Sequence, residues 1–128
     1  MRVLLDTCAL VWFAIDDDQL PEKARKVVES LDTEAFTSAA SAWEIATKVR
    51  LGKWPGAEGL ALDLVSVIRE LGFTELRVSV EHGVRAGLLP GPHRDPFDRM
   101  LIAQAQAENL PIVSCDRIFD EYHIRRIW

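Results

Sequence analysis

Two aspartates directly follow short apolar runs, a placement in which a carboxylate can take part in chemistry. Asp6 follows the run 3–5, Val-Leu-Leu, and Asp116 follows the run 111–115, Pro-Ile-Val-Ser-Cys. Both runs are typical of buried parallel strands. Ligands of an open parallel sheet bind outside the carboxyl ends of its strands. We therefore expect these two carboxylates at one edge of a sheet, although they are far apart in sequence.

A third carboxylate, Asp98, lies near the start of a helix that the pair Asp95-Pro96 is expected to open. At 100° per residue, Asp98 falls on the apolar face of this helix, where an unpaired charge is costly to desolvate. Capping is an alternative explanation, with Asp95 as the N-cap and Asp98 in the first turn. The placement of Asp6 and Asp116 at the same edge favours a site over capping alone.

Glu44 lies in a helix expected over residues 38–51. The apolar stripe of this helix consists of Ala42, Ile45, Ala46 and Val49. Glu44 falls on the opposite side together with Lys48, four residues later, which is typical of a solvated surface ion pair. The pattern of residues therefore does not by itself select Glu44 for a site.

Three or four carboxylates that converge in one crevice repel one another unless divalent cations lie between them. Ligands that are all oxygen favour Mg²⁺ or Mn²⁺ over zinc or copper, and Mg²⁺ accepts phosphate oxygens as further ligands. Two such ions about 4 Å apart can activate a water and stabilise charge on a scissile phosphate. The acids therefore predict metal-dependent cleavage of a phosphodiester.

Strand-like and helical segments alternate along the sequence. Strands are expected near residues 3–5, 35–37, 74–80, 111–115 and 124–128, and helices near 21–31, 38–51, 57–71 and 95–109. This alternation predicts an α/β fold, in which a mostly parallel sheet of four to five strands carries helices on both faces.

The composition is that of one compact domain over residues 1–128, with 48% hydrophobic residues. The apolar run 8–15 is far shorter than the roughly 20 residues of a membrane-spanning helix, and no secretory signal is recognised, so we expect a cytoplasmic protein. Cys8 and Cys115 lack the spacing of a zinc site or a disulfide framework and are expected to be buried, reduced thiols.

The formal net charge is −5, which argues against nucleic-acid binding by a broad basic surface. Metal ions bound by several carboxylates would cancel much of that charge where a phosphate approaches. The acidity is therefore compatible with a nucleic-acid substrate.

The sequence resembles VapC-type PIN domains over nearly its whole length. The segments that carry the resemblance are LLDTCALVWF (4–13), SAASAWEIATKVRLGKW (38–54), HRDPFDRMLIAQA (93–105) and PIVSCDRIFDEY (111–122). Each segment alone is common in unrelated proteins, whereas their ordered combination is specific.

The resemblance implies a set of site residues. In this family an Asp ends the first strand and a Thr or Ser follows it, which fits Asp6 and Thr7, and a Glu in the third helix fits Glu44. An Asp at the start of the later helix fits Asp98, and its neighbour Asp95 could share that role. Another Asp follows the next strand and fits Asp116, with Ser114 two residues before it. Asp6, Glu44 and Asp98 would hold the main metal ion, and Asp116 would support it or a second one.

The resemblance also implies a three-layer α/β/α fold, a homodimer and the activity of a toxin. That activity is the Mg²⁺-dependent or Mn²⁺-dependent cleavage of RNA, which leaves a 3′-hydroxyl and a 5′-phosphate. The implied partner is a VapB-type antitoxin whose C-terminal segment wraps the toxin and blocks the metal site.

Several further residues are candidates for contact with substrate or partner. Those near the acids are Thr7, Ser114, Lys48, Arg94, Arg99 and Arg117. Each basic residue taken singly fits a solvated charge or a local ion pair better than a phosphate contact, whereas the group as a whole favours phosphate binding more strongly. Trp12 and Trp43 are expected in the core, and Trp54 is expected at an interface because Pro55 and Gly56 follow it.

Three other enzyme or signalling classes fit poorly. A phosphorelay receiver needs a late lysine, and no lysine follows Lys53; a dehalogenase-like phosphatase needs a second acid where Cys8 stands. His82, His93 and His123 lack the spacing of a zinc hydrolase and fit surface residues or local hydrogen bonders better. A PIN-like module that binds RNA or protein without cutting remains the main alternative.

Overall fold

Five short parallel strands form one sheet in the computed structural model, which describes all residues from 1 to 128. They are β1 (Arg2–Leu5), β2 (Glu34–Ser38), β3 (Thr74–Leu76), β4 (Ile112–Val113) and β5 (Arg126–Ile127). The strand order is β3-β2-β1-β4-β5, and every pair is parallel. The prediction of a mostly parallel sheet of four to five strands is confirmed.

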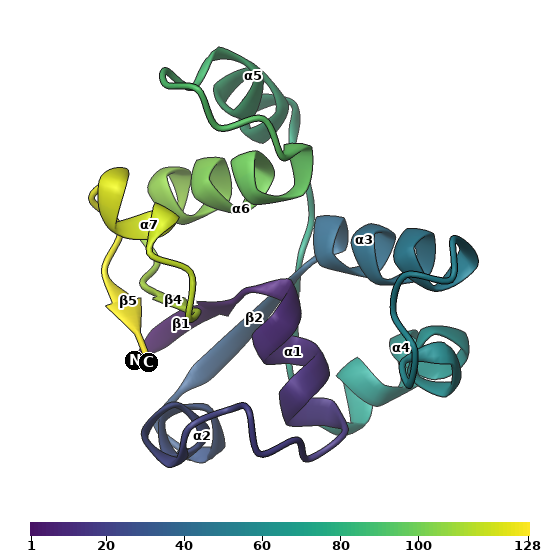
Figure 1. The fold of residues 1–128 in the computed structure, drawn as a ribbon. Helices are drawn as coiled ribbons and strands as arrows, with labels where there is room; N and C mark the ends of the chain where they lie inside the picture. The colour runs from purple at the N-terminus through teal and green to yellow at the C-terminus, as the bar shows by residue number, and fades with distance from the viewer.

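Seven helices connect and cover these strands. They are α1 (Thr7–Ala14), α2 (Glu22–Glu29), α3 (Ala39–Arg50), α4 (Glu58–Glu70), α5 (Val80–Leu88), α6 (Pro96–Ala107) and α7 (Ile118–Glu121). Helices α1 to α4 lie on one side of the sheet and α6 and α7 on the other, with α5 packed on the outer side of α6 (Figure 1). The fold is therefore a three-layer α/β/α arrangement, and no helix is long and apolar enough to cross a bilayer.

The two faces of the sheet bury separate apolar clusters. Side chains alternate between faces along a strand, so Val3 and Leu5 join the cluster under α1 to α4, while Leu4 joins the cluster under α6 and α7. All three side chains are fully buried. The central strand β1 is thus apolar on both sides, which explains its continuous hydrophobic run.

Three helices differ from the sequence expectations. The apolar segment from Thr7 to Ala14 forms α1, where no helix was predicted; it is hydrophobic nearly all round and so shows no helical periodicity. The short α7 was also not expected. The strand expected over 74–80 ends at Leu76, because Ser79 caps α5 in a reciprocal capping box with His82.

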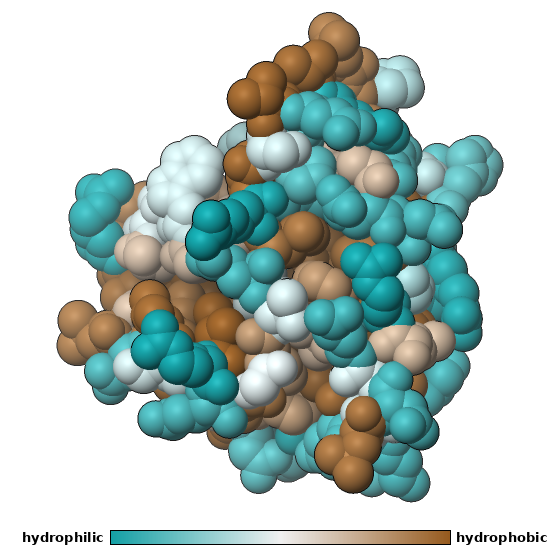
Figure 2. All heavy atoms as spheres, turned by 180° about the vertical axis from the view of Figure 1, so that it is seen from behind, coloured by the Kyte–Doolittle hydropathy of each residue, from teal (hydrophilic) through white to brown (hydrophobic).

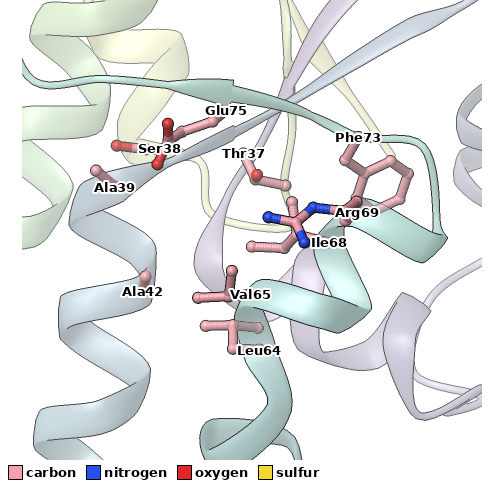
Figure 3. A pocket seen from close by; sticks show the side chains of 10 residues that line it. All are labelled: Thr37, Ser38, Ala39, Ala42, Leu64, Val65, Ile68, Arg69, Phe73 and Glu75. Carbon is pink, nitrogen blue, oxygen red and sulfur yellow. The ribbon is translucent and has the colours of Figure 1, made fainter.

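A cavity of about 260 Å³ lies between α3, α4 and the strands β2 and β3 (Figure 3). Its wall is mostly apolar, with the Thr37 side chain at its centre. The Thr37 hydroxyl oxygen is the one buried side-chain N or O atom of the structure without a hydrogen-bond partner. This position therefore bears an uncompensated desolvation cost.

Candidate active site

The carboxyl ends of the central strands bring together residues that are distant in sequence. Leu5 pairs with Thr37 of β2 and with Val113 of β4, so the next residues along, Asp6, Ser38 and Ser114, follow at one edge of the sheet. The Asp6 amide also donates to the Val113 carbonyl oxygen at 3.1 Å. This edge is where open parallel sheets bind ligands.

Asp6 forms the junction between β1 and α1. Its side chain is only 8% exposed, and its Oδ1 accepts a hydrogen bond from the Ala9 amide at 2.7 Å as the N-cap of α1. Burial raises the pKa of Asp6 to about 6; Ser114 and the Ala9 amide lower it, and the charges of Asp98 and Glu44 raise it further. No base forms an ion pair with this carboxylate, so its charge is poorly compensated.

Asp95 and Asp98 begin α6. Asp95 is the N-cap and accepts from the Phe97 and Asp98 amides at 2.9 and 3.1 Å, as the capping explanation predicts. Asp98 projects from the first turn, and its Oδ2 lies 3.0 Å from His93 Nε2. Burial raises the pKa of Asp98, the charges of Asp95, Asp116 and Glu44 add to that rise, and the His93 hydrogen bond opposes it.

The expectation that Glu44 is a solvated surface acid is wrong. Glu44 is 6% exposed, whereas Ala46, placed in the apolar stripe, is exposed. The buried face of α3 is rotated relative to the predicted one because α3 packs against α1 and α6 as well as α4. The predicted ion pair with Lys48 is present; Glu44 outweighs the effect of burial and raises the pKa of Lys48.

Asp116 lies in the exposed turn between β4 and α7. Its amide donates to Ser114 Oγ at 2.9 Å, and its Oδ1 accepts from the Ile118 amide at 3.0 Å. These two bonds fix the turn, and the Asp116 carboxylate is close enough to Asp98 to raise its pKa. Asp116 therefore belongs to the rim of the acid cluster.

We call Asp6, Glu44, Asp98 and Asp116 the acid cluster. As placed, no three His, Cys, Asp or Glu side chains of the structure stand close enough together to hold a metal ion. Two of the acids face basic partners, Glu44 with Lys48 and Asp98 with His93. The donor set of carboxylate oxygens, which includes Asp6 and Asp98 with raised pKa values, nonetheless suits a hard divalent cation.

The other predicted site residues fall into two groups. Thr7 and Ser114 are buried, and the Thr7 hydroxyl donates to Ser41 Oγ at 2.9 Å. Arg94 and Arg117 are exposed at the same edge as the acids and form no ion pair shorter than 4.0 Å.

Arg99 forms hydrogen bonds to the backbone at the end of α5 and in the segment that follows it. Its guanidinium donates to the carbonyl oxygens of Ala86, Gly87, Leu89 and His93 at 2.8 to 3.4 Å. These four contacts fasten the connection between α5 and α6, so most donors of this side chain are already used.

The tryptophans depart in part from expectation. Trp43 was expected in the core, but it is 63% exposed and meets the Phe97 ring edge-on at a centroid distance of 4.9 Å. Trp12 packs on Trp128 beside the core, as predicted. Trp54 is half-buried, and the Lys48 ammonium lies 5.6 Å from its ring centroid.

Both cysteines are free thiols near the acid cluster. Burial, and then the charges of Asp6 and Glu44, raise the pKa of Cys8 to about 12; burial and Asp6 also raise the pKa of Cys115. A high pKa leaves little reactive thiolate at neutral pH. The raised pKa values therefore disfavour thiol chemistry, but the expectation that both thiols are buried is wrong, because Cys8 is half-buried and Cys115 is exposed.

Sequence reasoning missed two polar residues that hold these elements together. Ser38, the N-cap of α3, donates to the fully buried Gln104 of α6 at 2.5 Å. A buried glutamine within an apolar helical face is a usable signal, because such a group needs a partner.

Comparison with solved structures shows the same fold at low sequence identity. VapBC2 from Rickettsia felis, bound to a DNA fragment from its promoter, matches with a TM-score of 0.69 and 16% identity, covering 98% of this chain and 97% of that chain. FitAcB from Neisseria gonorrhoeae matches with a TM-score of 0.64, 15% identity and coverage of 98% and 96%. FitAB bound to the IR36 DNA fragment gives 0.63, 16%, 98% and 93%.

No curated protein matches the sequence. The PIN domain family model, in contrast, matches residues 3–124, which include every strand end and helix that carries a member of the acid cluster. This chain belongs to the PIN domain family.

Proposed function

We propose that this chain is a Mg²⁺-dependent or Mn²⁺-dependent endoribonuclease, a single PIN domain that acts in the cytoplasm as the toxin of a VapBC-type pair. The observation that carries the proposal is the buried Asp6 carboxylate. It lacks a basic partner, and Asp98 and Glu44 add to its raised pKa. Like charges gathered in this way are stabilised by a divalent cation.

Asp6, Glu44 and Asp98 would hold the ion, with Asp116 in support and Asp95 able to share the role of Asp98. When bound, the ion supplies an activated water and charge stabilisation at the scissile phosphate. Glu44 and Asp98 face Lys48 and His93, so both carboxylates would have to exchange these bases for the ion in order to hold it. Lys48 and His93 would then be available to contact the substrate.

Exposed bases near the acid cluster are suited to hold the RNA backbone. Arg94 follows His93 and precedes the α6 cap, Arg117 follows Asp116, and Lys48 lies one turn beyond Glu44. Guanidinium groups bind phosphate in a bidentate manner. Thr7, Ser114 and Arg99 act more indirectly, since their polar groups already hold the elements around Asp6, Asp116 and His93.

Protein partners are the second part of the proposal. The similar structures are toxin–antitoxin complexes, which suggests a VapB-type antitoxin that blocks the acid cluster, together with homodimer formation. Helix α5 exposes Val80, Val84 and Leu88 by 86%, 57% and 79%, and apolar side chains crowd the top of the molecule over α5 in Figure 2. Exposed apolar patches of this kind support a role in protein contact.

The test is cleavage of a defined RNA by the purified chain freed of any antitoxin. We expect cutting in Mg²⁺ or Mn²⁺, none in EDTA, and products that end in a 3′-hydroxyl and a 5′-phosphate. The Asp6→Asn/Asp98→Asn double variant must be inactive; if it still cuts, the activity belongs to a contaminating nuclease.

One observation favours the non-catalytic alternative: the carboxylates of Glu44 and Asp98 face bases, and no ready-made metal group is present. An RNA-binding module of this kind would bind RNA equally well in EDTA and in Mg²⁺ and would cut in neither. That outcome would replace the nuclease proposal.

A further inference from the structure

We propose that Gln104 is a positioning residue whose bond to Ser38 fixes α3 against α6 and so holds Glu44 and Asp98 within reach of one metal ion. This inference rests on the proposed function. It concerns a residue outside the acid cluster that contacts none of the four carboxylates.

The two helices belong to different layers of the molecule. Helix α3 covers the same side of the sheet as α1 and α4, whereas α6 covers the other side (Figure 1). Ile45 packs in one apolar cluster, and Leu101 and Ile102 pack in the other. Neither apolar cluster alone therefore sets the distance between Glu44 on α3 and Asp98 on α6, and direct contacts between the helices, which we call ties, add to what the shared strand β1 provides.

The Ser38–Gln104 hydrogen bond is such a tie. The Ser38 hydroxyl donates to Gln104 Oε1 at 2.5 Å, and both side chains are buried, at 2% and 0% exposure. Ser38 is also the N-cap of α3 and accepts from the Ala40 amide at 3.0 Å. The tie thus joins the first turn of α3, six residues before Glu44, to a point six residues after Asp98.

The Gln104 amide has only one workable orientation. Its Nε2 donates to the Arg77 carbonyl oxygen at 3.3 Å and faces His82 Nδ1 at 3.4 Å. His82 Nδ1 also accepts from the Ser79 amide at 3.1 Å, and its Nε2 lies 2.9 Å from Glu108 Oε1. Gln104 Nε2 is thus placed against two acceptors, the Arg77 carbonyl oxygen and His82 Nδ1. This orientation leaves Gln104 Oε1 to accept from the Ser38 hydroxyl.

A second tie lies directly beside the acids. Trp43 and Phe97 meet edge-on at 4.9 Å, and each immediately precedes an acid of the cluster, Glu44 and Asp98 respectively. Two separated points of attachment prevent one helix from pivoting about the other. The aromatic contact alone would fix α3 against α6 at one point only, so loss of the Gln104 bond is expected to loosen the geometry of Glu44 and Asp98.

Outer residues that orient metal ligands are worth about 10-fold to 100-fold in metal affinity. We therefore expect Gln104→Met, which keeps the length and apolar volume of the side chain, to weaken Mn²⁺ binding by about tenfold. The measurement is a titration of the purified, antitoxin-free full chain with Mn²⁺ alone, followed by electron paramagnetic resonance of the free ion. A melting curve of each variant accompanies it.

The matched control is Ile102→Val on the same helix, which lowers stability by cavity formation and breaks no tie. A merely structural role for Gln104 predicts that both variants lose melting temperature and neither loses Mn²⁺ affinity. That result would overturn the proposal.

A double-variant cycle tests the bond itself. Ser38→Ala removes the same bond by deleting its donor. This substitution also removes the N-cap of α3, but that loss occurs both in the single Ser38→Ala variant and in the double variant, so it cancels when the two are compared. If the two residues act through one bond, Ser38→Ala/Gln104→Met binds Mn²⁺ no more weakly than the poorer single variant. Losses that multiply would mean independent effects and would overturn the proposal. A wild-type chain that binds no Mn²⁺ is a different result, which rejects the proposed function itself.

Discussion

The molecule contains two polar clusters, each with a buried centre, that are built on opposite principles. In the acid cluster, Asp6 has like-charged neighbours and no ion pair, and its pKa rises to about 6. In the second, which we call the glutamine network (Ser38, Gln104, His82 and Glu108), each polar side chain has a partner. Under the proposed function, the first cluster lowers stability and serves chemistry, whereas the second supports architecture. Three experiments test that contrast, and a fourth compares a buried hydroxyl that has a hydrogen-bond partner with one that has none.

The largest effect is expected from the acid cluster during cleavage. Asp98→Asn should lower the rate of RNA cleavage in Mg²⁺ by about a thousandfold, because charge stabilisation by a bound metal is worth several kcal/mol. The measurement is a single-turnover assay on a labelled RNA. Asp63→Asn, an exposed acid on α4, is the control and should cut at the wild-type rate. Equal rates for the two variants would remove the acid cluster from the chemistry.

The next largest effect is expected from the glutamine network, and it is a loss of stability where the acid cluster predicts a loss of cleavage rate. His82→Ala should lower the free energy of unfolding by about 2 kcal/mol, since it removes the capping bond to Ser79 and strands the partners Gln104 and Glu108. Urea denaturation followed by circular dichroism measures it. Substitution of exposed His123 should change stability by less than about 0.5 kcal/mol. A stable His82→Ala protein would contradict the architectural role.

The acid cluster should also produce an unusual pH dependence in EDTA. Burial and like charges raise the Asp6 pKa from 3.8 to about 6, so the folded state binds this proton more tightly than the unfolded chain. The free energy of unfolding therefore increases as pH falls through 6, and the gain is lost as pH rises again. We expect the wild type to gain about 1 kcal/mol between pH 7 and pH 5.

Asp6→Asn is the control for this pH effect. Because an amide does not titrate, the variant should lose most of the gain on acidification and be more stable than the wild type at pH 7. Urea titrations at the two pH values measure both properties. A wild type that becomes less stable on acidification would mean that Asp6 is well compensated.

The smallest effect comes from a single hydroxyl. Thr37→Val should raise the free energy of unfolding by about 1 kcal/mol, because the buried Thr37 oxygen has no hydrogen-bond partner. Thr7→Val is the matched case, since the buried Thr7 hydroxyl donates to Ser41, and it should lower stability by about 1 kcal/mol. Chemical denaturation distinguishes the two signs. Destabilisation by both substitutions would show that Thr37 does form a bond in solution.

The positions of the strand ends could be predicted from the sequence. The run Val3-Leu4-Leu5 predicts a strand that is apolar on both faces, and this strand places Asp6 at its end. Capping chemistry predicts the start of a helix at Asp95-Pro96, and helical periodicity then places Asp98 on its inner face. Helix α1 could not be predicted, since its residues are apolar on all sides and give no period. The segment after Leu76 leads to the N-cap of α5, where Ser79 and His82 form a capping box. This start of a helix was not predicted, because the usual partner in a capping box is Glu or Gln and not His.

Glu44 shows why the rest of the site depends on tertiary contacts. Its own helix places it opposite the apolar stripe, and only packing of α3 against α1 and α6 covers that face. The resemblance to PIN domains selected Glu44 as a site residue, whereas helical periodicity did not. Neither periodicity nor the family resemblance selected Gln104 or Ser38. Gln104 lies in a helix predicted from its apolar residues, and Ser38 has the usual residue type of a helix N-cap.

The Arg99 guanidinium binds four backbone carbonyl oxygens and no side chain, two in the last turn of α5 and two in the connection between α5 and α6. Main-chain oxygens are present whatever residue occupies a position. The path of this connection therefore depends little on the side chain at a position such as Arg94, whereas Gly91, with a φ of +95°, is a position where a side chain would strain it. Under the proposed function, substitution of Arg94 would change a contact to RNA without moving α6.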